Sequence, residues 1–190
     1  MELLQAPNEW LDKRIETEFD FDKLDAKQIS GEMAKIMMEN NGIGLAANQV
    51  GLDARIFVMR PLEHKEITKP FAIINPIIRE ISEETVAEKE GCLSSPLLFL
   101  QITRPKKVVA QFLDLDAKEC IIEFTGIDAR CFLHEYDHLE GIDFSQRVSR
   151  LKLDIAKSRQ KKLQRKLRKS NNGWTERRFT TCFWKVYQRR

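Results

Sequence analysis

Apolar residues first recur at helical spacing after Asp25. The repeating positions are Ile29, Met33, Ile36 and Met37. This spacing predicts a helix that begins near Asp25, whose carboxylate can cap the first turn, and that ends at Asn41-Gly42. Because its methionines share the apolar face, we interpret them as core residues rather than ligands.

Short runs rich in β-branched and aromatic residues follow and predict strands. The runs are residues 55–59, 71–74, 77–81, 107–113 and 120–124. The last two are separated by a short polar segment that is typical of a hairpin. Strands and helices do not alternate regularly, which favours an α+β fold with short, mainly antiparallel sheets. The apolar run 97–100 is expected in a loop, as core or as a pocket wall.

The second helical pattern covers residues 128–140, before Gly141, and contains the sequence H-E-x-x-H. His134 and His138 lie one turn apart on the same face of such a helix, which makes them half of a metal site. Glu135 lies about 100° around the helix, where a base for a metal-activated water is needed. Charged helices also produce this pattern by chance, so the motif alone leaves two surface histidines as an alternative.

A third ligand must come from elsewhere in the chain. The metzincin pattern fails because Phe144 occupies the position of its last histidine. The remaining histidine, His64, lies in a charged connection and is interpreted as a surface residue. Cys92, in the turn-like sequence Glu90-Gly91-Cys92-Leu93-Ser94, is the better ligand.

A glycine- and alanine-rich segment, residues 42–51, precedes the first predicted strand. Its small residues allow the backbone to approach a substrate closely. Gln49 is the one long amide in the segment, and a tight connection beside the sheet would let this amide face a reacting carbonyl.

These three segments, in this order, resemble the signature motifs of the peptide deformylases: G-x-G-x-A-A-x-Q, E-G-C-x-S and H-E-x-x-H. Three ordered motifs with about forty residues between them make coincidence improbable. The resemblance extends over residues 3–148. Leu133 stands where the family usually has glutamine, a change expected to alter support for the site.

The resemblance implies hydrolysis of the formyl group from N-terminal formylmethionine of nascent peptides. It implies metal ligation by Cys92, His134 and His138, with the fourth position open for water and Glu135 as general base. Gln49 and the backbone N–H of Leu93 would stabilise the developing oxyanion. The implied metal is Fe²⁺, with Zn²⁺, Ni²⁺ or Co²⁺ as alternatives. The expected substrate-binding residues are Ile43, Gly44, Leu45, Gly91, Ile127 and Cys131, the last two on the histidine face of the helix.

Composition is that of a globular protein: 190 residues, 42% hydrophobic, with a mean hydropathy of -0.43. No apolar run approaches the ~20 residues that span a bilayer, and no secretory signal is visible. We therefore expect a cytoplasmic protein without a membrane span. The four cysteines have no tight paired spacing and are expected to be reduced.

Charge divides the chain into two parts. Residues 151–190 carry 14 Lys+Arg and 2 Asp+Glu, a net charge of +12, whereas residues 1–150 carry 18 and 27, a net charge of -9. We expect a catalytic domain over 1–150 and a basic C-terminal helix with an aromatic and basic tail over 151–190. Ribosomal RNA is the partner such a tail suits; packing on the domain is the alternative.

Two rival functions remain at this point. Another H-E-x-x-H metallopeptidase would use the same water and base with a cleft for an extended peptide. A non-enzymatic RNA-binding protein would rely on the basic tail, with the metal motif degenerate. Cleavage of internal peptide bonds in casein would favour the first rival.

Overall fold

A computed structural model describes residues 1–169 of the chain. Its elements in order are α1 (Glu9–Asp12), α2 (Ala26–Glu39), β1 (Gly44–Ala46), the 3-10 helix η1 (Ala47–Val50), β2 (Ile56–Met59), β3 (Phe71–Ile81), β4 (Thr85–Cys92), β5 (Ser95–Pro105), β6 (Lys107–Leu113), β7 (Glu119–Thr125), α3 (Gly126–Leu139), the 3-10 helix η2 (Phe144–Arg147) and α4 (Arg150–Lys169). The fold is α+β, as the sequence predicts.

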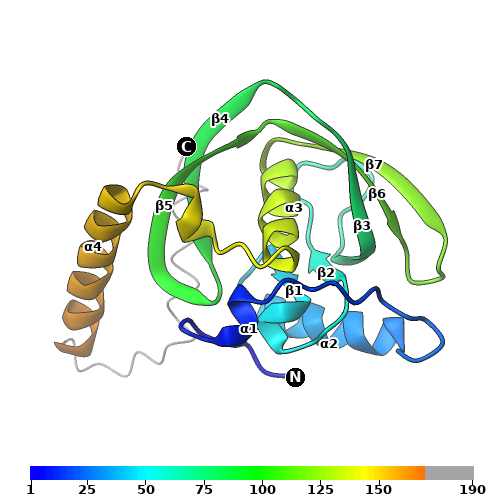
Figure 1. The fold of residues 1–190 in the computed structure, drawn as a ribbon, viewed down its shortest axis with the longest axis horizontal. Helices are drawn as coiled ribbons and strands as arrows, with labels where there is room; N and C mark the ends of the chain where they lie inside the picture. The colour runs from blue at the N-terminus through cyan, green and yellow to red at the C-terminus, as the bar shows by residue number, and fades with distance from the viewer. Residues whose placement is uncertain (170–190) are drawn as a thin grey trace.

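The strands form two antiparallel sheets. The larger sheet has the order β1-β2-β3-β6-β7, and β4 pairs with β5 in a separate two-stranded sheet. Helix α3 lies between the larger sheet and the β4–β5 hairpin (Figure 1). This arrangement brings one face of α3 toward the end of β4, where the cysteine motif lies.

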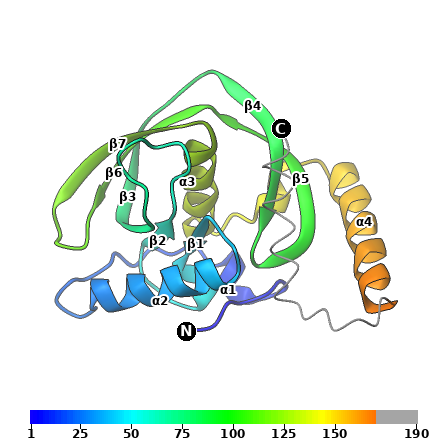
Figure 2. The same cartoon turned by 180° about the vertical axis from the view of Figure 1, so that it is seen from behind.

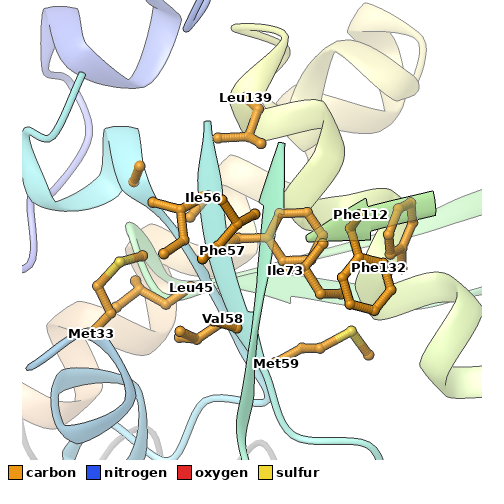
Figure 3. Close-up of a cluster of buried hydrophobic side chains, with 14 of the residues drawn as sticks. Met33, Leu45, Ile56, Phe57, Val58, Met59, Ile73, Phe112, Phe132 and Leu139 are labelled. Atoms are coloured by element: carbon orange, nitrogen blue, oxygen red, sulfur yellow. The ribbon is translucent and has the colours of Figure 1, made fainter. Parts of the chain in front are cut away.

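The main core surrounds β2, which is buried at every position. Both α2 and α3 contact this strand, which explains why it carries an unbroken apolar run. Figure 3 shows Met33 of α2 and Phe132 of α3 in the same cluster as the β2 side chains. The Phe57 and Phe132 rings meet edge to face, with their centroids 5.3 Å apart.

The helix expected after Asp25 is confirmed. The Asp25 carboxylate accepts the backbone N–H of Gln28 at 2.9 Å and caps α2. The hairpin of β6 and β7 is confirmed as well. The two strands expected at 71–74 and 77–81 are instead one strand, because Asn75 forms a bulge with φ of 50° and its side chain hydrogen-bonds the backbone of Phe19 in both directions.

The prediction of a loop at residues 97–100 is wrong. These residues belong to β5, whose pairing with β4 the apolar run alone did not indicate. Leu98 and Leu100 are buried in a second, smaller core with Ile102 and Phe144. Alternate side chains of β5 therefore point into this core, which is the period-2 pattern of a half-buried strand.

Helix α4 lies beside β5 (Figure 2). Its inner side chains Leu153 and Ala156 pack against the smaller core, and the Gln160 side-chain amide donates to the Pro96 carbonyl at 2.7 Å. The aromatic and basic residues expected to contact RNA, from Trp174 to Arg190, lie outside the described residues. Among residues 1–169 no helix is long and apolar enough to cross a membrane.

Candidate metal centre

Helix α3 places the two histidines of the H-E-x-x-H motif side by side. Their ring centroids are 5.0 Å apart with an angle of 76° between the ring planes. Both side chains are buried, His138 at 1% exposure. One turn of helix therefore aims two imidazoles at the same small volume.

Cys92 reaches this volume from the end of β4, just before the turn into β5. Its sulfur lies 3.2 Å from Nε2 of His138. One ligand atom from each of Cys92, His134 and His138 can be chosen so that all three lie within 4.8 Å of one another. A thiolate and two imidazoles suit a divalent transition metal, so the residues present fit such an ion.

Glu90 orients His134 from behind. The Glu90 carboxylate contacts Nδ1 of His134 at 3.1 Å, which leaves Nε2 for a metal. Burial alone would raise the pKa of Glu90, but hydrogen bonds from His134 and Arg104 outweigh it and lower the pKa to about 2. Burial likewise opposes the charged form of His134, while its contacts with Cys92 and Glu90 raise the pKa of this histidine.

A buried ion network braces Glu90. Nε of Arg104 donates to it at 2.6 Å, Nη1 of Arg130 donates at 2.5 Å, and Arg104 also donates to Asp137 at 2.7 Å. Asp137 in turn binds Arg147 of η2. Each charge in this network is paired, which is the condition for keeping charges inside a protein.

Glu135 points a carboxylate into the same region from the next position of α3. It is 4% exposed, and its Oε2 atom has no hydrogen-bond partner among the described residues. Burial raises the pKa of Glu135 to about 7. Such a carboxyl can both take and release a proton near neutral pH.

Gly44 of β1 makes room for this carboxylate. A Cβ atom at residue 44 would lie 2.3 Å from Oε1 of Glu135, closer than any real contact. The second glycine of the G-x-G sequence is thus required by the close approach of Glu135 to the backbone.

Gln49 lies in η1 with its amide directed at the cysteine motif. Its Oε1 accepts the backbone N–H of Ala46 at 2.8 Å, and its Nε2 donates to Ser94 Oγ at 3.1 Å. The same Nε2 atom lies 3.4 Å from the Cys92 sulfur. The amide is therefore held with its N–H groups beside the three-residue cluster.

A cavity of about 1490 Å³ opens onto the cluster. Of the expected substrate-binding residues, Ile43, Gly44, Gly91, Ile127 and Cys131 line it, together with Leu93, Gln49 and Glu135. The Cys131 thiol donates to the Ile43 carbonyl at 3.4 Å, which ties α3 to the segment before β1.

Leu45 does not follow the expectation. Its side chain is fully buried in the main core, where it packs beneath β1 rather than on the cavity surface. The reason is strand geometry, since neighbouring residues of a strand point to opposite sides. His64 also lies away from the cluster, and its Nδ1 accepts the backbone N–H groups of Glu66 and Ile67.

Sequence reasoning gave no role to several polar residues that the structure brings to the site: Glu90, Ser94, Arg104, Arg130 and Asp137. For the four charged residues, the available signal was charge at positions of a helix or strand that face the core; Ser94, in the turn after β4, gave no such signal. Leu133, in contrast, packs in the main core, and its carbonyl accepts from Arg104 at 3.4 Å.

Comparison with known proteins gives the same picture as the site. A family model described as polypeptide deformylase matches residues 1–154. This chain belongs to that family.

A peptide deformylase of Wolbachia sp. subsp. Brugia malayi is 39% identical over 175 residues, covering 87% of this chain and 96% of the relative. One from Maricaulis maris is 37% identical over 164 residues, covering 86% and 94%. The crystal structure of peptide deformylase from Ehrlichia chaffeensis superposes with a TM-score of 0.76 at 38% identity, covering 86% of this chain and 96% of that one.

Proposed function

We propose that this protein removes the formyl group from the N-terminal formylmethionine of nascent polypeptides and releases formate. Family membership supports the reaction. The observation that carries it is the cluster of Cys92, His134 and His138 beside Glu135, whose Oε2 atom has no hydrogen-bond partner among the described residues, with a cavity that opens onto the cluster. The reaction is hydrolysis of an amide.

Cys92, His134 and His138 are proposed to hold one divalent metal. When bound, the metal supplies Lewis acidity that polarises the formyl carbonyl and lowers the pKa of water. We favour Fe²⁺, with Zn²⁺, Ni²⁺ and Co²⁺ as alternatives, because one thiolate and two imidazoles suit several borderline metals. Glu90 fixes the His134 ring for this role through its contact with Nδ1.

Glu135 is proposed to take the proton from the attacking water and to deliver it to the leaving amine. Its burial and its pKa of about 7 suit both steps. The Gln49 amide and the Leu93 backbone N–H are proposed to donate to the oxygen that gains negative charge. Donors of this kind typically contribute ~3 kcal/mol each to lowering the barrier.

The methionine side chain is proposed to enter the recess lined by Ile43, Ile127 and Cys131. This recess adjoins the histidine face of α3, so a side chain there places the preceding formyl group near the cluster. A formyl group is smaller than an internal amide with its flanking residues, so we propose that the region beside Gly44 and Glu135 admits the formyl group and excludes internal amides.

Formate release from a short formyl-Met peptide tests this function. Protein purified without oxygen and analysed for metal should release formate stoichiometrically with the free peptide. Metal removal by a chelator should stop the release, and re-addition of Fe²⁺ should restore it. Hydrolysis of casein without formate release would favour a different metallopeptidase.

We also propose that α4 draws the enzyme to the ribosome. Residues 150–169 contain ten basic residues and one acidic residue, and none of them is buried. Phosphate-rich RNA attracts such a surface, while the catalytic domain, at -9, is repelled. The nascent substrate is made on ribosomes, which supports this partner and a cytoplasmic location.

A further inference from the structure

The connection between β2 and β3, residues 60–70, borders the cavity. Leu62 and Glu63 of this connection line it, as do Ile127 and Cys131 of α3, and Glu63 contacts Ile127 directly. Leu62 is 38% exposed, so it presents apolar surface to whatever the cavity holds. A long connection of this kind forms a firm wall only if other parts of the molecule hold it.

Asp128, in the first turn of α3, holds this connection. Its Oδ1 accepts the backbone N–H of Leu62 at 2.7 Å, and its Oδ2 accepts those of Glu63 and His64 at 3.1 and 2.8 Å. The carboxylate is 3% exposed. Three consecutive N–H groups thus depend on one buried side chain, and charged acceptors make the stronger hydrogen bonds.

The connection also binds α3 in the opposite direction. Oε2 of Glu63 accepts the backbone N–H of Ile127 at 3.3 Å, at the positive end of the helix dipole. Gly126 allows this approach, because a Cβ atom there would lie 2.1 Å from Glu63 Oε2. The carboxylates of Asp128 and Glu63 thus hydrogen-bond in opposite directions and hold the connection to the first turn of α3. We call this pair of contacts the clasp.

We propose that Asp128 is a positioning residue that sets the width of the recess for the side chain of the first substrate residue. It acts through Leu62 and Glu63, which it holds against the recess beside Ile127. This inference rests on the proposed deformylation. When the wall of the recess is fixed, a side chain that fills the recess, such as methionine, binds more tightly than a short one. The clasp therefore contributes to selection of formylmethionine and takes no part in the chemistry.

The test compares formyl-Met and formyl-Ala peptides of the same following sequence. Asp128→Asn keeps the size of the side chain but weakens its hold on three N–H groups. We expect kcat/KM for the formyl-Met peptide to fall ~10-fold, mainly through KM, because an apolar recess discriminates by about this factor per methylene. The value for the formyl-Ala peptide should stay near the parent level, so the ratio between the peptides falls.

Two further variants make the result decisive. Glu63→Gln loosens the clasp from the other side and should lower the same ratio less, which keeps the test valid if Asp128→Asn does not fold. Asp25→Asn changes the cap of α2, away from the cavity, and should leave the ratio unchanged. Metal content should match the parent in all three variants.

An unchanged peptide ratio in both Asp128→Asn and Glu63→Gln would overturn the inference. An equal loss of kcat for both peptides would also overturn the inference, because that result would mean that Asp128 supports the metal centre and not the recess. Parent protein that releases no formate from either peptide would refute the proposed function instead, and the two failures are thereby distinguished.

Discussion

The contact between Gly44 and Glu135 shows how much of the site depends on single atoms. One added methyl group would meet the Glu135 carboxylate at 2.3 Å and force it from its position. Glycine at residue 44 is therefore required by the position of the Glu135 side chain and not by a backbone turn.

We predict that Gly44→Ala lowers kcat/KM for a formyl-Met peptide ~100-fold while metal content stays near the parent level, since displacement of a reacting group by about 1 Å has an effect of this size. Gly31→Ala is the matched control, because a Cβ atom there meets nothing within 4 Å. In the middle of α2 it should raise the free energy of unfolding by up to ~1 kcal/mol and leave activity unchanged. Equal activities for the two variants would contradict the role of Gly44.

The role of Cys92 as a metal ligand can be tested by measuring the metal content of serine variants. Cys92→Ser replaces a thiolate with a ligand that is harder and far less acidic, so we expect metal affinity to fall by more than ~10-fold, as even changes behind a ligand commonly do. Cys120→Ser should retain the parent metal content, because Cys120 lies on β7 away from the cluster. Equal metal retention by the two serine variants, measured by elemental analysis after dialysis, would exclude Cys92 as a ligand.

The sequence predicted residues whose chemistry is visible in a motif and missed those whose role depends on three-dimensional contact. His134, His138 and Cys92 were predicted to meet, and the structure brings them together. Arg130 could not be assigned, because its partners, which include Glu90 and the Ile102 carbonyl, come from β4 and β5, which pair far from it in sequence.

The β4–β5 hairpin and α3 are joined by buried charged side chains. Arg104 of β5 is 4% exposed and links Glu90 of β4 to Asp137 of α3. The hairpin carries Cys92 and the helix carries both histidines, so this link, together with the contacts of Arg130 and His134 with Glu90, connects the two halves of the candidate site.

We predict that Arg104→Met lowers the free energy of unfolding by ~3 kcal/mol, because it removes the cation shared by two buried carboxylates. Glu90 would then keep Arg130, and Asp137 would keep Arg147. Urea denaturation of the variant and the parent measures the change. Lys106→Met breaks an exposed ion pair with Glu84 in the adjacent turn and should cost less than ~1 kcal/mol. Similar midpoints for the two variants would show that the buried link is unimportant.

Element prediction worked where periodicity was local and failed where pairing was distant. α2 and α3 follow from their apolar and polar spacing and their caps. β5 was mistaken for a loop because its neighbours in sequence are a proline and the cysteine motif, whereas its order comes from pairing with β4 and from the smaller core. β3 continues through a bulge that only the Asn75 contacts with Phe19 explain.

Helix α4 has one side that packs against the rest of the molecule and one side that carries exposed basic residues. Leu153 and Ala156 pack against the smaller core, so removing the entire helix would also disturb the domain. The basic side chains of α4 are exposed, and Lys161, Lys162, Arg165 and Lys166 do not line the cavity.

We predict that changing Lys161, Lys162, Arg165 and Lys166 together to glutamine weakens salt-sensitive co-sedimentation with ribosomes ~10-fold or more, since each lost phosphate contact lowers affinity. Turnover of a short formyl peptide should be unchanged. A control with Lys23, Lys27, Lys65 and Lys69 changed to glutamine alters the net charge equally within residues 1–150 and should co-sediment like the parent. If both variants lost co-sedimentation equally, net charge alone would explain ribosome binding and α4 would have no specific role.

Glu135 is proposed to transfer the proton at a metal held by Cys92, His134 and His138. The most direct measurement is formate release by metal-analysed Glu135→Gln beside the parent, with the same formyl-Met peptide. The variant should hold the parent amount of metal and release formate ~10²–10⁴-fold more slowly, because the amide cannot accept the proton. Turnover near the parent rate with metal bound would contradict the role of Glu135 in proton transfer.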